Sequence, residues 1–349
     1  MLVMHGISSS YGVFFTSFQR EFGWSRATIS GASSLAFVLM GLSAVFGGKL
    51  TDKYGPKFTM VLSGLILGIG YALVSQVHAV WQLYLFYGLF IGMGNSSADV
   101  ALLPTVARWF VHRRGMMTGI VKMGTGFGIF IVPLVASYLI VTHSWRTAYA
   151  VLAVLAVVCI IGLAQLLKWE PSEVGAHPNG ASSPAARVRA VERVSLTAIE
   201  AMHTRQFWMV CIAYFLAWYA TQAVMVHIAA HALDSGLSVS LAAGMISAIG
   251  AASIAGRLTM GIVGDRTGNR RALTICFVIL AVGLVWLLFT RGPWPLLVFA
   301  LIYGFAHGGL FSTISPLMAE LFGTRSLATI LGPLFFLGQI GGALGPIVT

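Results

Sequence analysis

The segment GKLTDKYGPK, residues 48–57, recurs as GIVGDRTGNR at residues 261–270, 213 positions further along the chain. Both copies follow the pattern Gly-x-x-x-Asp-(Lys/Arg)-x-Gly-x-(Lys/Arg), and each lies between two long apolar stretches. A glycine-rich stretch that ends at Pro133 is matched at the same offset by one that ends at Pro346. The sequence is therefore an internal duplication, which is how parallel membrane repeats are built.

The composition excludes a soluble protein. Of 349 residues, 58% are hydrophobic and 9% are charged, and the mean hydropathy is +0.87. Soluble domains carry about a quarter charged residues, so this chain lacks the charge to cover a surface facing water. The three cysteines lie inside apolar stretches and indicate packing rather than a metal or redox site. We therefore predict an integral, multi-pass protein of the lipid bilayer.

Eleven stretches of roughly 20 mostly apolar residues are long enough to cross a membrane. They are residues 1–19, 27–49, 58–77, 81–106, 115–141, 147–167, 205–232, 239–262, 272–290, 294–318 and 326–349. The repeat places a partner for span 147–167 beyond residue 349 and starts the first span about eight residues before Met1. We expect an all-α fold of two six-helix bundles, from which the start of helix one and all of helix twelve are missing.

Basic residues concentrate on one side of the predicted membrane. With residues 51–57 placed in the cytoplasm, fifteen of the 21 basic residues lie inside and four outside. This distribution obeys the positive-inside rule, so the net charge of +11 is a topology signal rather than a nucleic-acid footprint. We predict a bacterial inner (plasma) membrane location. The two remaining basic residues, Lys122 and Arg257, lie within spans.

One long polar segment, residues 169–204, separates the two halves. Its prolines, small residues and mixed charge are typical of a linker, which the topology places in the cytoplasm and which ends in a short amphipathic helix at 192–203. The predicted domains are an N-terminal transmembrane bundle, 1–168, and a truncated C-terminal bundle, 205–349.

The duplicated segment resembles the signature loop of the major facilitator superfamily. A carboxylate at a helix junction beside basic residues can latch the inside-closed state, and glycines allow close helix approach and a tight turn. The predicted conformational gate consists of Gly48, Asp52, Lys53, Gly55, Lys57, Gly261, Asp265, Arg266, Gly268 and Arg270.

Three further stretches resemble the monocarboxylate porter branch of that superfamily, which includes bacterial oxalate/formate exchangers. They are YGVFF (11–15) leading to FGWSR (22–26), ARWFVHRRG (107–115), and SWRTAY (144–149). The resemblance implies alternating-access transport of a small organic anion. Two features depart from the branch: Ser253 stands where animal porters have an acidic residue, and the span at 326–349 lacks the lysine of oxalate exchangers.

Arg257 is the first candidate for substrate binding. It lies in a span, four residues before the second signature loop, and a guanidinium can hold a carboxylate with two hydrogen bonds. The resemblance implies the same role, because porters of this branch carry a substrate-anchoring arginine on helix eight. The alternative is a structural arginine that extends to the cytoplasmic face or pairs with a loop carboxylate.

Asp99 and Lys122 form a second candidate site. Asp99 lies eight residues before Ala107 and Lys122 eight after Arg114, so a helical hairpin puts both ~12 Å from the cytoplasmic ends. Burying charge in a membrane is costly, so we expect the two to pair. The pair either couples protons through Asp99 and contacts substrate through Lys122, or it is a static ion pair.

Other polar residues are weaker candidates. His307, next to two glycines, is a candidate for substrate binding and proton coupling, because a buried imidazole can relay protons near neutral pH. Tyr11, Asn95 and Gln222 are predicted to line the substrate cavity. His227 and His231 lie four residues apart on one helix face, where interface or gate roles are favoured over a metal site.

The sequence contains no Walker loop, no paired carboxylates at glycosidase spacing and no Gly-x-Ser-x-Gly elbow. We therefore expect no enzyme activity, no cofactor and no metal. The predicted function is secondary active transport of a small organic anion, a monocarboxylate, by proton symport or anion exchange, in a protein that works as a monomer. The alternatives are a major facilitator antiporter for another solute, such as a dicarboxylate or a drug, and a non-transporting membrane sensor with the same fold.

Overall fold

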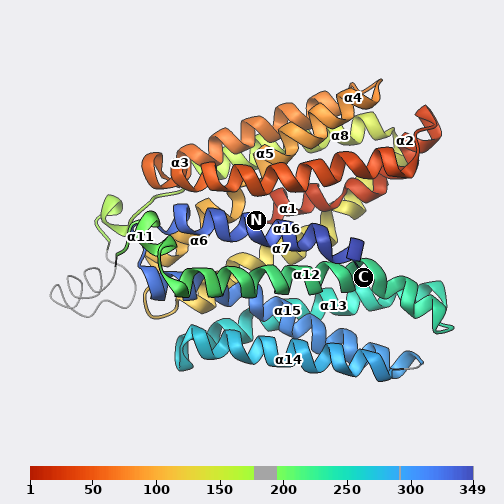
Figure 1. Cartoon of the computed structure of the whole chain (residues 1–349). Helices are drawn as coiled ribbons and strands as arrows, with labels where there is room; N and C mark the ends of the chain where they lie inside the picture. Colours follow the sequence, from red (N-terminus) through yellow and green to blue (C-terminus); the bar gives the residue numbers. More distant parts are fainter. Residues whose placement is uncertain (177–194, 291, 349) are drawn as a thin grey trace.

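The structure is a computed structural model that describes residues 1–176, 195–290 and 292–348. All regular secondary structure in these ranges is helical, which confirms the all-α prediction (Figure 1). The longer helices are α2 (Tyr11–Phe22), α3 (Arg26–Val74), α6 (Ser97–Trp109), α7 (Arg114–Thr142), α8 (Trp145–Leu155), α12 (Arg205–Asp234), α13 (Val239–Thr267), α14 (Asn269–Phe289), α15 (Pro293–Phe322) and α16 (Leu327–Val348). The shorter ones are α1 (Leu2–Ser9), α4 (Val80–Leu83), the π-helix η1 (Tyr84–Ile91), α5 (Gly92–Asn95), the π-helix η2 (Ala156–Ile161), α9 (Gly162–Ala164), the 3₁₀-helix η3 (Pro171–Val174) and α11 (Ala198–Met202).

Eight helical segments of the described residues are long and apolar enough to cross a membrane, whereas the sequence predicts eleven spans. The difference has three sources. The 49-residue α3 contains two spans that meet at a kink, the first span is divided into α1 and α2, and the fourth is divided into α4, η1, α5 and α6. All eleven predicted stretches are therefore helical in the structure.

The kink in α3 lies at Gly55, in the first signature segment. Its φ of +89° is in the left-handed region, where a residue without a Cβ avoids strain. Gly268, the matching residue of the second segment, has a φ of +94° between α13 and α14. The two copies of the sequence repeat thus make the same backbone turn.

The helices form two groups that meet along α16 and α7. In Figure 1, α3, α4, α5 and α8 lie on one side and α12, α13, α14 and α15 on the other. Helix α16 packs against both α3 and α12, and α7 packs against both α1 and α13. We call the end of the molecule that carries Gly55, Gly268 and α11 the loop end.

Half of the predicted linker, residues 177–194, lies outside the described residues. Its described parts include η3 and α11, and α11 is shorter than the helix predicted at 192–203. Thr197 explains the late start, because its hydroxyl accepts the Glu200 N–H while the Glu200 carboxylate accepts the Thr197 N–H. The N–H of Leu196 donates to the carbonyl of Phe322 at 3.1 Å, so this part of the linker is attached to the loop end.

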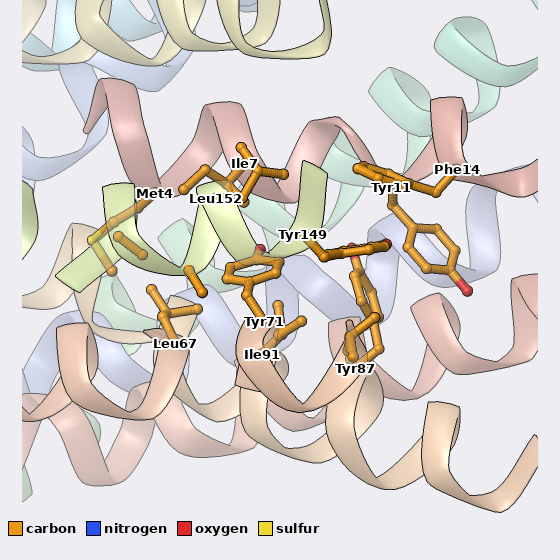
Figure 2. Close-up of a cluster of buried hydrophobic side chains, with 14 of the residues drawn as sticks. Met4, Ile7, Tyr11, Phe14, Leu67, Tyr71, Tyr87, Ile91, Tyr149 and Leu152 are labelled. Carbon is orange, nitrogen blue, oxygen red and sulfur yellow. The ribbon is translucent and has the colours of Figure 1, made fainter. Parts of the chain in front are cut away.

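The first group of helices is packed around buried aromatic rings. Figure 2 shows four tyrosines, Tyr11, Tyr71, Tyr87 and Tyr149, among aliphatic side chains. The rings of Tyr11 and Tyr87 are 4.0 Å apart, and those of Tyr71 and Tyr149 are stacked at 6.1 Å. Aromatic pairs at such distances add to the stability that burial alone provides.

Candidate functional site

A central cavity of about 190 Å³ lies where the two groups of helices meet. Residues of α1, α3, α5, α6, α7, α12 and α16 line it, so both groups contribute. Its polar and aromatic walls include His5, Asn95, Asp99, Tyr214, Trp218 and Gln339. Of the residues predicted from the sequence to bind substrate or protons, Asn95 and Asp99 are in this wall.

Asp99 and Lys122 form the ion pair that their spacing predicts. The Lys122 Nζ atom is 2.6 Å from the Asp99 Oδ1 atom, and the lysine side chain is only 8% exposed. Asp99 reaches the cavity wall, whereas Lys122 lies behind it on α7. The carboxylate therefore separates the lysine from the cavity.

Arg257 lies at the crossing of α7 and α13, and its side chain is buried. One guanidinium nitrogen donates to the carbonyl of Lys122 at 3.1 Å, while its Nε has no hydrogen-bond partner among the described residues. Two glycines of α7 make the room: a Cβ at Gly126 would lie 2.9 Å from the guanidinium, and one at Gly119 would lie 2.4 Å from the Arg257 carbonyl oxygen. The arginine faces neither lipid nor the loop-end surface, but it is not in the cavity wall either.

His5 is a residue that the sequence did not reveal. Its Nε2 atom is 4.0 Å from Asp99 Oδ1, has no hydrogen-bond partner, and belongs to a side chain in the cavity wall. A single histidine near the start of an apolar stretch carries no pattern, and only the folded structure brings α1 close to Asp99 of α6.

The other predicted cavity residues divide into two sets. Tyr11 lines a side cavity next to the central one, and its hydroxyl donates to the carbonyl of Ile29 at 2.7 Å. Gln222 packs against Gly342 of α16 and lines neither cavity. The prediction for Gln222 thus has no geometric support, since the face of α12 that reaches the cavity carries Tyr214 and Trp218.

His307 lies on α15, one aromatic layer away from the cavity. Its ring contacts Phe311 edge-on at 4.9 Å, and Phe311 contacts Trp218 of the cavity wall at 5.0 Å. Its Nδ1 is buried without a hydrogen-bond partner. His227 and His231 are exposed, and His227 contacts the carbonyl of Pro346 at 3.3 Å.

At the loop end, Asp265 of the second signature segment caps α7. Its two carboxylate oxygens accept the backbone N–H groups of Gly115 at 2.7 Å and Met116 at 2.8 Å. A carboxylate at a helix N-terminus satisfies free N–H groups and meets the positive end of the helix dipole. One residue of the second group thus holds a helix of the first.

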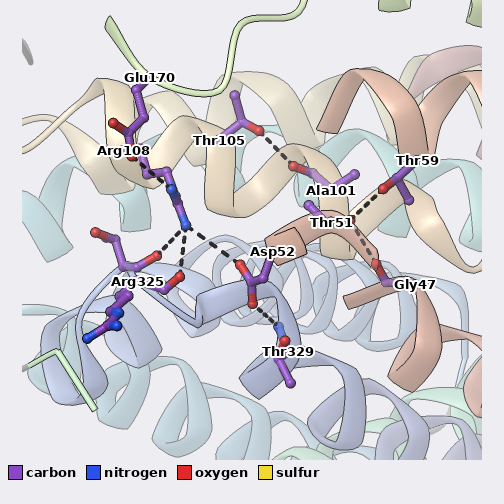
Figure 3. A network of polar contacts seen from close by, with 11 residues as sticks. Gly47, Thr51, Asp52, Thr59, Ala101, Thr105, Arg108, Glu170, Arg325 and Thr329 are labelled. Carbon is purple, nitrogen blue, oxygen red and sulfur yellow. Dashed lines mark hydrogen bonds and ion pairs between the residues drawn. The ribbon is translucent and has the colours of Figure 1, made fainter. Parts of the chain in front are cut away.

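Asp52 of the first signature segment does the same for α16. Its Oδ2 accepts the N–H of Thr329 at 2.7 Å, and its Oδ1 is 3.6 Å from Arg108 (Figure 3). Arg108 also donates to the carbonyls of Thr324 and Arg325 at 3.0 Å. The second terminal nitrogen of Arg108 is 3.0 Å from a carboxylate oxygen of Glu170. The guanidinium therefore contacts α3, the segment before α16 and the start of the linker.

The basic residues of the signature segments do not take part in these contacts. Lys53, Lys57, Arg266 and Arg270 are exposed, and among the described residues none of them forms an ion pair with an acidic side chain. The sequence predicts carboxylates beside basic residues, but their partners are backbone N–H groups and Arg108. These partners are far away in sequence, and no local pattern marks them.

Two of the three motif stretches meet at the opposite end of the molecule. The rings of Phe22 and Trp24 stack at 4.4 Å, and Trp145 lies edge-on to Phe22 at 6.1 Å. Glu21 accepts hydrogen bonds from the indole of Trp145 and from Arg146. The contact joins the end of α2 to the start of α8.

Comparison with known proteins agrees with the fold. The profile of the Major Facilitator Superfamily matches residues 1–346. The chain belongs to this superfamily. Major facilitator proteins are multi-pass membrane transporters, and the match spans both signature segments described above.

Individual members of the superfamily match over nearly the whole chain. Monocarboxylate transporter 13 of Bos taurus is 26% identical over 348 residues, which cover 98% of this chain and 78% of that protein. The uncharacterized MFS-type transporter YhjX of Escherichia coli (strain K12) is 28% identical over 319 residues, covering 89% and 76%. The structure of the proton:xylose symporter XylE superposes with a TM-score of 0.76 at 14% identity, covering 99% and 85%, and shows the shared major facilitator fold.

Proposed function

We propose that this major facilitator transporter moves a small organic anion, a monocarboxylate, by alternating access. The observation that carries the proposal is an excess of positive charge behind the central cavity. Lys122 and Arg257 are both buried, and Asp99 is the carboxylate that pairs with Lys122. Among the residues that the structure describes, no carboxylate lies within ion-pair distance of Arg257.

A buried cation without an acidic partner is costly in a membrane. A substrate carboxylate that enters the cavity supplies the missing negative charge. The Nε of Arg257 lies behind the cavity wall, and in this proposal it becomes a donor to that carboxylate when α7 and α13 shift during the transport cycle. In this proposal the carboxylate displaces Asp99 from Lys122 or adds to the pair, and His5 and His307 provide further sites for a proton. The resemblance to monocarboxylate transporters supports the same class of substrate.

The capped helices support an alternating-access cycle. Asp265 of α13, which caps α7, and Asp52 of α3, which caps α16, hold the two groups of helices together at the loop end. We place this end and the linker on the cytoplasmic side of a bacterial inner membrane, because the exposed basic residues lie there. Substrate then enters the cavity from the other end, and transport requires both carboxylates to leave their helix N-termini.

Uptake into proteoliposomes tests the proposal. Labelled lactate, pyruvate, formate and oxalate are compared in the wild-type protein, in Arg257→Gln and in Arg26→Gln, an exposed arginine that serves as the matched control. We expect uptake of monocarboxylates that Arg257→Gln reduces at least about tenfold and Arg26→Gln leaves unchanged, since one charge-assisted hydrogen bond contributes about 1.5–3 kcal/mol. Wild-type uptake rates in Arg257→Gln would refute the role of Arg257 in binding the substrate carboxylate. Transport of hydrophobic cations in preference to these acids would favour a drug antiporter.

A further inference from the structure

A side cavity of about 230 Å³ adjoins the central cavity. The two have a common wall, made by Ser8, Ser9, Phe37, Met40 and Asn95. A water molecule occupies about 30 Å³ of liquid, so the side cavity has room for a group the size of roughly seven waters. A molecule held in the central cavity can therefore extend into it.

Two interrupted helices border this side cavity. The first transmembrane stretch breaks at Ser10, between α1 and α2, and Ser9 and Tyr11 on either side of the break line the cavity. The fourth stretch is π-helical over η1, which supplies Tyr87 and Ile91. The break at Ser10 is a single tighter turn, since its N–H still donates to the carbonyl of Ile7. Such irregular turns and π-helical segments of membrane helices are frequent at functional sites.

Asn95, at the common wall, has an unsatisfied acceptor. The residue is 5% exposed, and its Oδ1 has no hydrogen-bond partner. Its amide nitrogen faces only the sulfur of Met40 at 3.7 Å. A buried amide oxygen without a donor costs about 1–3 kcal/mol, which a ligand hydroxyl can recover.

The remainder of the side cavity suits a neutral, apolar body. Among the described residues, no acidic or basic side chain lines it. The rings of Tyr11 and Tyr87 form one wall, and their hydroxyls already donate to the carbonyls of Ile29 and Ser8. The wall therefore presents aromatic faces, which favour a flat or branched apolar group.

We propose that the side cavity is a subsite for the neutral end of the substrate, and that this end is an aryl-sized group carrying a hydroxyl. The Asn95 amide oxygen accepts the hydroxyl proton, while the carboxylate lies toward Lys122 and Arg257. The inference rests on the proposed transport of monocarboxylates. It narrows their class to hydroxyaryl or similarly large hydroxyalkyl acids, in preference to acids as small as acetate.

Transport of three matched probes tests the subsite. Proteoliposomes are assayed with acetate, phenylacetate and 4-hydroxyphenylacetate, in the wild-type protein and in Asn95→Leu, which keeps the branched shape of the side chain but removes the amide. We expect the wild type to have the lowest KM for 4-hydroxyphenylacetate and the highest for acetate. Asn95→Leu should reduce the preference for the hydroxylated acid over phenylacetate about three- to tenfold.

A second variant tests the space rather than the hydrogen bond. Ser33 lines the side cavity but not the central one, and its hydroxyl donates to Ser30 of its own helix. Ser33→Leu should raise KM for both aryl acids and leave acetate unchanged. The subsite is refuted if acetate is the best wild-type probe, or if both variants change all three acids equally.

Thermal unfolding in detergent separates this inference from the proposed function. 4-Methylphenol has the neutral body and hydroxyl without a carboxylate, and toluene lacks the hydroxyl. We expect 4-methylphenol to stabilise the wild type more than toluene does, and this difference to vanish in Asn95→Leu. If this difference is seen in the wild type and vanishes in Asn95→Leu while no carboxylate is transported, the subsite is supported and the proposed anion transport is refuted. If 4-methylphenol stabilises the wild type no more than toluene does, the subsite is refuted.

Discussion

Asp265 on α13 accepts a 2.7 Å hydrogen bond from the backbone N–H of Gly115, at the start of α7. The two residues are 150 positions apart and belong to different groups of helices. Asp52 makes the equivalent contact with Thr329 at the start of α16. The duplicated aspartate therefore performs the same task twice, each time holding the N-terminus of a helix in the other half of the chain.

Removing the charge of Asp265 should weaken this contact. In Asp265→Asn one amide oxygen remains as acceptor, but the NH₂ group faces an N–H donor and the helix-dipole attraction is lost. We expect a cost of about 2 kcal/mol to the closed loop end, hence at least about a tenfold change in the closed-to-open ratio. Distances between spin labels at the exposed positions Lys57 and Arg270 measure that ratio.

The matched control for this experiment is Arg266→Gln. Arg266 is adjacent in sequence and exposed, and it forms no ion pair with an acidic side chain among the described residues. Its replacement should leave the label distances unchanged. An equal response of both variants would mean that the charge of the loop matters and the helix cap does not.

Gly119 should tolerate no side chain. A Cβ there would lie 2.4 Å from the carbonyl oxygen of Arg257, which is backbone and cannot move aside without separating α7 from α13. We expect Gly119→Ala to lower stability by about 1–3 kcal/mol, measured by thermal unfolding in detergent. Gly162→Ala is the control, because a Cβ at Gly162 meets nothing within 4 Å; a similar loss in both would refute the close-packing explanation.

The signals that predicted correctly from the sequence are those with a period or a repeat. The apolar stretches predicted where the helices lie, and the 213-residue offset identified two matching turns, at Gly55 and Gly268. Equal depth on a helical hairpin gave the Asp99–Lys122 pair. Each of these depends on local geometry or on duplication, so one sequence contains the information.

Contacts between distant helices were not predictable in the same way. Arg108 reaches the carbonyl of Thr324 216 positions away, and nothing in its local motif distinguishes it from other loop arginines. His5 lines the cavity although the sequence did not predict it, and Gln222 was predicted but lines neither cavity. The rotation of a helix about its axis decides which polar side chain faces a cavity. That rotation depends on packing against several neighbours at once.

Two fully buried tyrosines should respond oppositely to loss of the hydroxyl. The Tyr71 hydroxyl has no hydrogen-bond partner (its ring is labelled in Figure 2), whereas the Tyr303 hydroxyl donates to the carbonyl of Thr221 at 3.1 Å. We expect Tyr71→Phe to be neutral or stabilising by about 1 kcal/mol and Tyr303→Phe to be destabilising by a similar amount. Thermal unfolding measures both, and a loss in Tyr71→Phe equal to that in Tyr303→Phe would contradict the prediction.

A double substitution distinguishes a static role of the Asp99–Lys122 pair from a functional one. Lys122→Met leaves the Asp99 carboxylate, which is 21% exposed at the cavity wall, without its cation, so we expect less destabilisation than the about 3–5 kcal/mol that a fully buried pair costs. Lys122→Met combined with Asp99→Leu removes both charges and should recover most of the stability. A functional pair predicts that this stable double variant no longer accumulates monocarboxylate in proteoliposomes against a pH gradient. Wild-type accumulation in the double variant would show that the pair only holds α6 and α7 together.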